Sequence, residues 1–133
     1  MKEFHLEILT PDGRAFEGMV ESLLVHAIDG DVEFLAGHVD YIAALSVGRA
    51  RIRTAEGDRL AAISGGFLSV DKKSVKLVAT TFEFADEIDL NRARVAKENA
   101  EAAIQKAKND REILIAKAKL QRAISRISVA GKK

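Results

Sequence analysis

The chain of 133 residues is long enough for one modest core with an appendage, because domains span about 50–250 residues, and too short for a second large domain. It contains no cysteine, which excludes disulfide frameworks, thiolate metal sites and cysteine nucleophiles. The formal net charge is only +1, and neither a signal-like leader nor a run of about 18 uncharged apolar residues occurs, so we expect a soluble protein.

The first eighty residues show the pattern of short β-strands. Apolar and polar residues alternate in residues 3–8 and 49–54, which gives each strand one wet face. Residues 23–25 and 60–63 are apolar on both faces, which is typical of central strands. The turn signals between the strands are Pro11-Asp12-Gly13, Asp29-Gly30-Asp31, Glu56-Gly57-Asp58, Ser64-Gly65-Gly66 and Asp71-Lys72-Lys73-Ser74. This spacing predicts an antiparallel sandwich or a flattened barrel.

Two segments of this region admit an interpretation as binding sites. Arg49, Arg51 and Arg53 could bind nucleic acid, but no aromatic residues interleave with them, which favours a solvated face. Ser64-Gly65-Gly66 could cradle an anion, but it lacks the lysine and the helix of a phosphate loop, which favours a strand-joining turn. The three histidines are scattered, and no nucleophile has an evident base, so neither a metal site nor catalytic residues are predicted.

The distribution of glycine divides the chain into two units. Eight of the nine glycines lie at or before Gly66, and from Ile88 onward the sequence is rich in alanine, lysine and arginine. Glycine serves turns between strands and costs about 0.5–1 kcal/mol relative to alanine inside a helix. We therefore expect a β domain over residues 1–84 and a helical domain over residues 85–133.

The second unit is predicted to be a pair of helices. Small and apolar residues follow one helical stripe at positions 90, 93, 96, 100, 103 and 107 and another at 113, 116, 120, 123 and 127, with the break at Asn109-Asp110. Helices of about 15–18 residues are marginal alone, so they should pack as an antiparallel hairpin. Because alanine-rich stripes bury little apolar area, this hairpin should be weakly closed and able to open.

The hairpin is basic, whereas the β unit is acidic. Residues 1–84 hold 9 Lys and Arg against 13 Asp and Glu, while residues 85–133 hold 12 against 7. No acidic residue follows Glu112, so the last cations are unopposed: Lys117, Lys119, Arg122, Arg126, Lys132 and Lys133. Such a segment favours an anionic neighbour, and the alternative is a solvated face that supports solubility.

The junction between the two units admits two interpretations. Asp89 is placed to cap the first helix, with Arg92 three residues on as an i,i+3 partner. Alternatively, the helix N-terminus and Arg92 hold a phosphate, while Asp89 accepts from a base amine or a ribose hydroxyl.

Five motifs in this order resemble the epsilon subunit of bacterial, Bacillus-type, rotary proton-translocating ATP synthases over essentially the whole chain. They are Leu9-Thr10-Pro11-Asp12-Gly13, Gly37-His38, Ser64-Gly65-Gly66-Phe67, Ile88-Asp89-Leu90-Asn91-Arg92-Ala93 and Ile127-Ser128-Val129-Ala130-Gly131. Two positions depart from the pattern: Ala36, where the family usually has proline, and Asn99, where a close relative has a further arginine.

The resemblance implies a flattened antiparallel β-sandwich followed by a two-helix hairpin, and a regulatory subunit that is not an enzyme. In that family the sandwich touches the gamma subunit and the membrane c-ring, and the hairpin either folds down or extends beside gamma into the catalytic head. Extended, it meets acidic segments of the catalytic beta and alpha subunits and inhibits ATP hydrolysis. The implied location is peripheral, at the cytoplasmic face of the bacterial membrane, without insertion into it.

Carried over by position, the resemblance implies a non-catalytic ATP site in the folded-down form, made by Glu83, Ile88, Asp89, Arg92, Ala93, Arg122 and Arg126. ATP is then a regulatory ligand, and no cofactor is expected. Contacts with the catalytic subunits are expected from Lys117, Lys119, Arg122 and Arg126. The alternative outside this family is a free-standing β-sandwich adaptor with a basic helical arm for nucleic acid.

Overall fold

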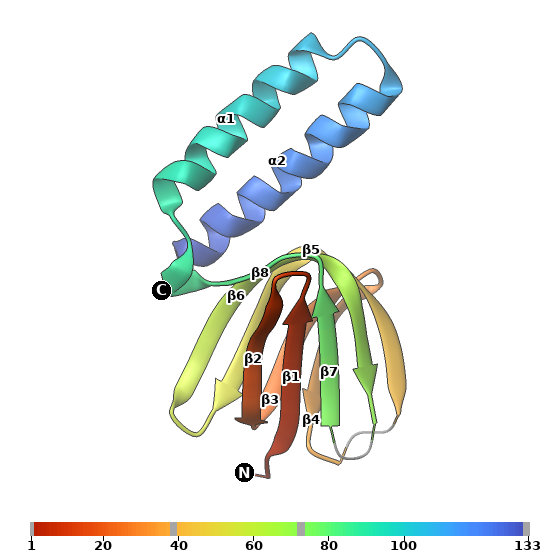
Figure 1. The fold of residues 1–133 in the computed structure, drawn as a ribbon, viewed down its shortest axis with the longest axis vertical. Helices are drawn as coiled ribbons and strands as arrows, with labels where there is room; N and C mark the ends of the chain where they lie inside the picture. Colours follow the sequence, from red (N-terminus) through yellow and green to blue (C-terminus); the bar gives the residue numbers. More distant parts are fainter. Residues whose placement is uncertain (1, 38–39, 72–73, 132–133) are drawn as a thin grey trace.

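The computed structural model describes residues 2–37, 40–71 and 74–131. Of the features predicted above, His38, Lys72, Lys73, Lys132 and Lys133 lie outside the described residues. The elements in chain order are β1 (Phe4–Thr10), β2 (Gly13–Val20), β3 (Ser22–Ala27), β4 (Gly30–Leu35), β5 (Tyr41–Thr54), β6 (Gly57–Val70), β7 (Ser74–Ala79), β8 (Phe82–Phe84), the 3₁₀ turn η1 (Ala85–Glu87), α1 (Leu90–Lys106) and α2 (Asp110–Ala130) (Figure 1).

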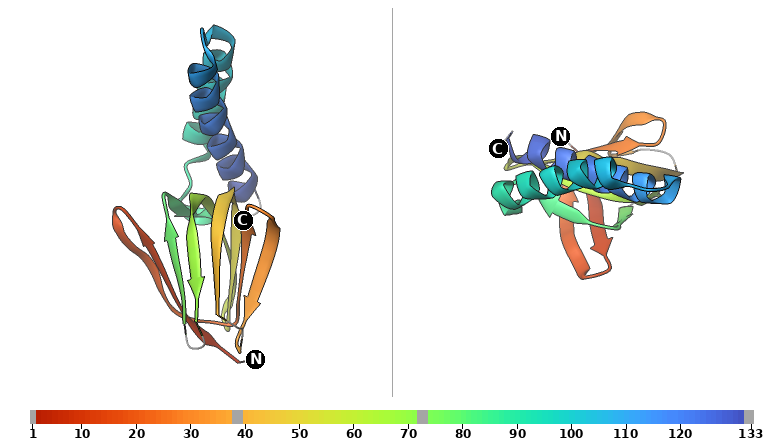
Figure 2. Two further views of the ribbon diagram at one scale, coloured as in Figure 1. Left: turned by 90° about the vertical axis from the view of Figure 1, so that its right-hand side faces the viewer. Right: turned by 90° about the horizontal axis from the view of Figure 1, so that it is seen from above.

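The strands form one continuous sheet that curls into two layers. Its order is β2-β1-β7-β6-β5-β3-β4, and β8 adds to β6. All pairs are antiparallel except β1 with β7, in which Leu9 lies opposite Val78. The 14-residue strands β5 and β6 pair along their whole length and belong to both layers (Figures 1 and 2). The predicted sandwich is thus confirmed, with one parallel pair, and β3 and β6 are interior strands as predicted.

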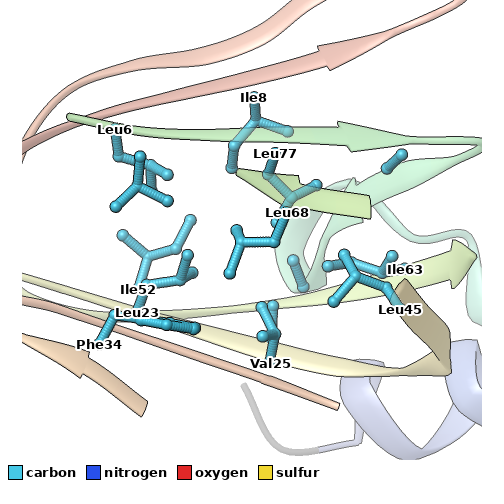
Figure 3. Packing of buried hydrophobic residues seen from close by; sticks show 14 of the residues in the cluster. Leu6, Ile8, Leu23, Val25, Phe34, Leu45, Ile52, Ile63, Leu68 and Leu77 are labelled. Atoms are coloured by element: carbon cyan, nitrogen blue, oxygen red, sulfur yellow. The ribbon is translucent and has the colours of Figure 1, made fainter. Parts of the chain in front are cut away.

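The core lies between the two layers and is built by the strands alone. Figure 3 shows side chains from opposite layers pointing toward one another, among them Leu6, Ile8, Ile52, Leu68 and Leu77, all without exposed surface. Full burial of such a side chain stabilises the fold by about 1.5–3 kcal/mol. Every residue of this main cluster precedes η1. The sandwich therefore has a core that does not depend on the helices.

The predicted turn at Ser64-Gly65-Gly66 is wrong, because these residues lie inside β6. Gly65 and Gly66 have positive φ angles of 77° and 122°, and a Cβ on Gly66 would stand 2.0 Å from the Val78 carbonyl oxygen. At this point the partner of β6 changes from β7, which pairs with residues 66–70, to β8, which pairs with residues 61–63. The glycines therefore kink a strand instead of ending it.

The arginine ladder on β5 agrees with the favoured interpretation as a solvated face. Arg51 donates to Glu33 at 2.6 Å, and Arg53 donates to Asp58 at 3.0 Å. The hydrogen bond to Asp58 raises the pKa of Arg53 above its usual value. Two of the three arginines are thus engaged with carboxylates of other strands: Glu33 on β4, two strands away in the sheet, and Asp58 on the adjacent β6.

The helices begin and end close to the predicted positions. Asn109 caps α2, its Oδ1 accepting from the Glu112 amide at 2.9 Å, which confirms the break. On α2 the whole predicted stripe is buried or half-buried, and on α1 Ala93 and Ala100 are buried. Ala103 is an exception: it is exposed, and Ile104 turns inward because the packed face follows a seven-residue spacing from Leu90 through Lys97. The two helices pack as an antiparallel pair (Figure 1).

Within residues 2–37, 40–71 and 74–131, the hairpin touches the sandwich only at its base (Figures 1 and 2). The end of α2 rests on β5, β6 and η1, while most of both helices stands clear. The apolar contact beneath it is small and largely alanine: Ala62, Ala85, Ile88, Val129 and Ala130, with Leu60 and Leu90 half-buried beside them. This seat is separate from the sandwich core.

Because the core ends at Phe84, a chain that stops after this residue should fold without the hairpin. We expect cooperative thermal unfolding by near-UV circular dichroism and a dispersed amide NMR spectrum close to that of the same residues in the full chain. A collapsed amide spectrum for the truncated chain would show that the hairpin is part of the folding unit.

Candidate functional site

A cleft of about 560 Å³ lies where the N-terminus of α1 meets the sandwich. This size suits a small organic ligand, since such pockets measure about 300–1,000 Å³. Its walls come from the end of β1 and the β1–β2 turn, the β7–β8 connection, β8, the η1–α1 junction, the first two turns of α1 and one side chain of α2. The lining residues are Thr10, Asp12, Thr80, Thr81, Phe82, Glu83, Glu87, Ile88, Asp89, Arg92, Ala93, Ala96 and Arg126.

The cleft gathers six of the seven residues predicted for nucleotide binding: Glu83, Ile88, Asp89, Arg92, Ala93 and Arg126. The seventh, Arg122, is half-buried on α2 one turn before Arg126, but it does not line the cleft. Lys117 and Lys119 are exposed farther along α2. The structure thus brings together side chains from β8, α1 and α2.

Sequence reasoning missed the wall contributed by Thr10, Asp12, Thr80 and Thr81. The Pro11-Asp12-Gly13 signal predicts the turn that the structure contains and belongs to one of the five motifs, but neither observation indicates a wall of the cleft. The parallel pairing of β1 with β7 brings the ends of both strands to one edge of the sheet, and no local spacing in the sequence indicates this pairing.

Asp89 caps α1 as predicted. Its Oδ1 accepts from the Arg92 backbone amide at 3.1 Å, and its backbone is extended, as in most N-caps. The i,i+3 contact therefore uses the amide of Arg92 and not its guanidinium, which makes no ion pair within the described residues. Ile88 is buried in the apolar seat directly before the cap and so fixes the direction in which α1 leaves the sandwich.

Arg126 and Glu83 face each other across the cleft. Arg126 Nε donates to Glu83 Oε1 at 2.5 Å. The Arg126 side chain is 29% exposed and the Glu83 side chain is 36% exposed. Glu87, beside them, accepts from the Phe84 amide at 3.3 Å. The pair links the end of α2 to β8, 43 residues apart in the sequence.

The lining carries two guanidinium groups, those of Arg92 and Arg126, and four carboxylates. Planar guanidinium groups bind phosphate through paired hydrogen bonds, whereas carboxylates accept from amines and hydroxyls. Phe82 and Ile88 offer apolar surface, and the small side chains of Ala93 and Ala96 leave room for a ligand in the cleft. This arrangement suits a ligand with an anionic end and a donor-bearing end. In the part of the chain described here, His, Asp and Glu side chains form no group that could hold a metal ion.

A second surface lies on the outer face of β5 and β6. Ile28, Ile42 and Phe67 are 69%, 77% and 49% exposed. Ala44 connects the three residues. It lies opposite Phe67 in the sheet, and its carbonyl oxygen accepts from the Ile28 amide at 3.2 Å. Ile42, two residues before Ala44 on β5, lies on the same face of the strand. We name Ile28, Ile42, Ala44 and Phe67 the apolar patch. Grouped apolar exposure of this kind marks interaction surfaces.

Comparison with known proteins covers both units. The profile of the family described as "ATP synthase, Delta/Epsilon chain, beta-sandwich domain" matches residues 3–85, and that of "ATP synthase, Delta/Epsilon chain, long alpha-helix domain" matches residues 86–131. The ATP synthase epsilon chain of Bacillus velezensis is 40% identical over 98% of this chain and 99% of its own length. The ATP synthase epsilon chain of Caldicellulosiruptor saccharolyticus is 39% identical over 96% of this chain and 93% of its own length.

A similar fold occurs in a chain of the Euglena gracilis mitochondrial ATP synthase, with a TM-score of 0.83 and 21% identity over 98% of this chain and 82% of that chain. A chain in the structure of the central stalk and c-ring of the Tetrahymena thermophila mitochondrial ATP synthase is also similar. Its TM-score is 0.63 and its sequence identity is 13%, over 98% of this chain and 96% of that chain. Neither described helix has the length and apolar composition needed to span a membrane.

The cap makes a prediction that needs no ligand. Asp89→Ala should destabilise the hairpin by about 0.5–2 kcal/mol because the first turn of α1 loses its acceptor, whereas Asp89→Asn keeps an acceptor and should stay close to wild type. Thermal melts followed by the helical signal at 222 nm on the full chain measure both. Equal stability of the alanine and asparagine variants would contradict the capping role.

Proposed function

The chain belongs to the delta/epsilon chain family of ATP synthase as a non-catalytic central-stalk subunit, and on this premise we propose that ATP in the cleft holds its hairpin closed and that the open hairpin inhibits ATP hydrolysis. The established part is a role in ATP synthesis and proton transport. Because the family matches both units along the whole chain, a free-standing nucleic-acid adaptor has no support.

The observation that carries the proposal is that the cleft needs both units. Glu83 stands on β8, Arg92 on the first turn of α1, and Arg126 near the end of α2. We call the hairpin closed when its two helices pair and the end of α2 rests on the sandwich, as in this structure, and open when it has left the sandwich. A ligand that contacts Arg92 and Arg126 together therefore binds the closed hairpin better than an open one. By mass action such a ligand shifts the population toward the closed form.

The chemistry of the lining supports ATP as this ligand. Arg92 and Arg126 supply the donors for phosphates, and Arg122, one helical turn away, extends the same basic face of α2. Asp89 caps the helix with one carboxylate oxygen, which leaves the second to accept from a ribose hydroxyl or a base amine. Glu83 accepts from such donors once Arg126 turns to a phosphate.

Inhibition would follow from the same cations. With the hairpin open, Lys117, Lys119, Arg122 and Arg126 are free to pair with carboxylates of the catalytic beta and alpha subunits. In the closed structure Arg122 and Arg126 are half-buried, and Arg126 is engaged with Glu83. ATP and the catalytic subunits thus compete for one set of side chains, which couples nucleotide binding to inhibition.

The sandwich would supply the attachment to the rotor. The apolar patch is the candidate contact with the gamma subunit and the c-ring, since burial of its exposed isoleucines and Phe67 would stabilise an interface. Such an attachment places the chain peripherally at the cytoplasmic face of the membrane.

ATP binding is tested by calorimetry on the isolated full chain. Wild type should bind ATP, and Arg92→Ala should weaken binding about tenfold or more through the loss of a charged phosphate donor. Arg94→Ala, an exposed arginine on α1 outside the cleft, is the matched control and should bind as wild type does. Absence of heat with millimolar ATP, or unchanged binding by Arg92→Ala, would refute the nucleotide site.

Inhibition is tested in the assembled enzyme. Changing Lys117, Lys119, Arg122 and Arg126 together to glutamine should raise the ATP hydrolysis rate and weaken its dependence on salt, because the lost contacts are electrostatic. The control changes an equal number of exposed or half-buried cations elsewhere on the hairpin: Arg94, Lys97, Lys106 and Arg111. The proposal fails when both sets leave hydrolysis unchanged or raise it equally.

A further inference from the structure

The closed hairpin is joined to the sandwich by adjacent side chains of α2. Ser125 Oγ donates to the Gly48 carbonyl oxygen at 3.2 Å, and Arg126 Nε donates to Glu83 Oε1 at 2.5 Å. Consecutive residues of a helix point about 100° apart, so the two bonds reach different strands, β5 and β8. Within the described residues these are the side-chain hydrogen bonds that connect α2 to the sandwich.

Of the two contacts, the one between Arg126 and Glu83 carries charge. It is short and half-buried, so it is less screened than a fully exposed ion pair. Breaking it from one side leaves the other charge half-buried without its partner, which costs more than losing a neutral hydrogen bond. The apolar seat below is made mostly of alanines and adds little area. The pair is therefore the contact on which docking depends most strongly.

We propose that Glu83 and Arg126 form a latch that favours the closed hairpin in the isolated chain when no nucleotide is bound; in the assembled enzyme the catalytic subunits would compete with Glu83 for Arg126. In the closed state without nucleotide the Arg126 guanidinium donates to the Glu83 carboxylate instead of to the phosphate of a ligand. The latch itself does not depend on ATP binding, while the exchange of Glu83 for phosphate rests on the function proposed above. The hairpin then has two closed states, one held by the chain's own carboxylate and one held by a ligand.

The latch is tested on the full chain without nucleotide. Because the chain has no native cysteine, Ala15→Cys on β2 and Ala118→Cys on α2, both exposed, accept a pair of spin labels. The distance distribution between the labels reports how much of the hairpin has left the sandwich. Glu83→Gln and Arg126→Gln should each raise the ratio of open to closed hairpin about fivefold. Arg111→Gln, an exposed cation at the start of α2, is the matched control and should leave the ratio unchanged.

A charge swap separates the ion pair from packing. Glu83→Arg alone should open the hairpin, and adding Arg126→Glu should return the ratio to near the wild-type value, which a role limited to packing would not do. A wild-type distance distribution for Glu83→Gln, or a swapped variant as open as Glu83→Arg alone, would overturn the latch. These measurements contain no nucleotide, so they are independent of the calorimetry that decides ATP binding.

Discussion

The narrow base on which α2 rests against β5 and β6 is the constraint on which the rest of the structure depends. The sandwich completes its core before Ala85, so it can support a hairpin without needing it. The seat under the hairpin is small and rich in alanine, and polar contacts from Ser125 and Arg126 hold the helix in place. A joint with so few contacts defines the position of the hairpin, and a ligand or partner that binds one of its states better shifts the population toward that state.

Arg126 connects the possible states of the chain. Its guanidinium binds Glu83 in the closed structure and stands in the same cleft as Arg92, where a phosphate would meet both. It also belongs to the run of cations that follows Glu112, a stretch of sequence without acidic residues. One guanidinium cannot serve a carboxylate of its own sandwich, a phosphate and a catalytic subunit at once. Under the proposed function, this exclusivity, more than any change in fold, would let a ligand at the base of the hairpin regulate the contacts that the rest of the hairpin makes.

Local patterns predicted most of the fold. Period-two alternation predicted strands, and the stripes predicted both helices. Asp89 is the cap that the sequence indicated, and Asn109, which caps α2, lies at the predicted break. Glycine was a weaker guide, because Gly65 and Gly66 kink β6 where a turn was expected. The parallel pairing of β1 with β7, and with it the Thr10 and Thr80 wall of the cleft, depends on contacts distant in sequence. Charge patterning singled out Arg126, whereas Glu83 was indicated only by the family resemblance, and no local pattern predicts their ion pair because 43 residues separate them.

The most direct measurement is the hydrolysis rate of the assembled enzyme with the hairpin locked closed. Ala62 and Val129 belong to the same buried cluster across the joint, so we choose these two positions for cysteines intended to form a disulfide in the docked state, in a chain that has no other cysteine. At ATP concentrations too low to fill the cleft, the cross-linked enzyme should hydrolyse ATP faster than the same enzyme after reduction. An equal or slower rate in the locked state would contradict the view that release of this joint causes inhibition.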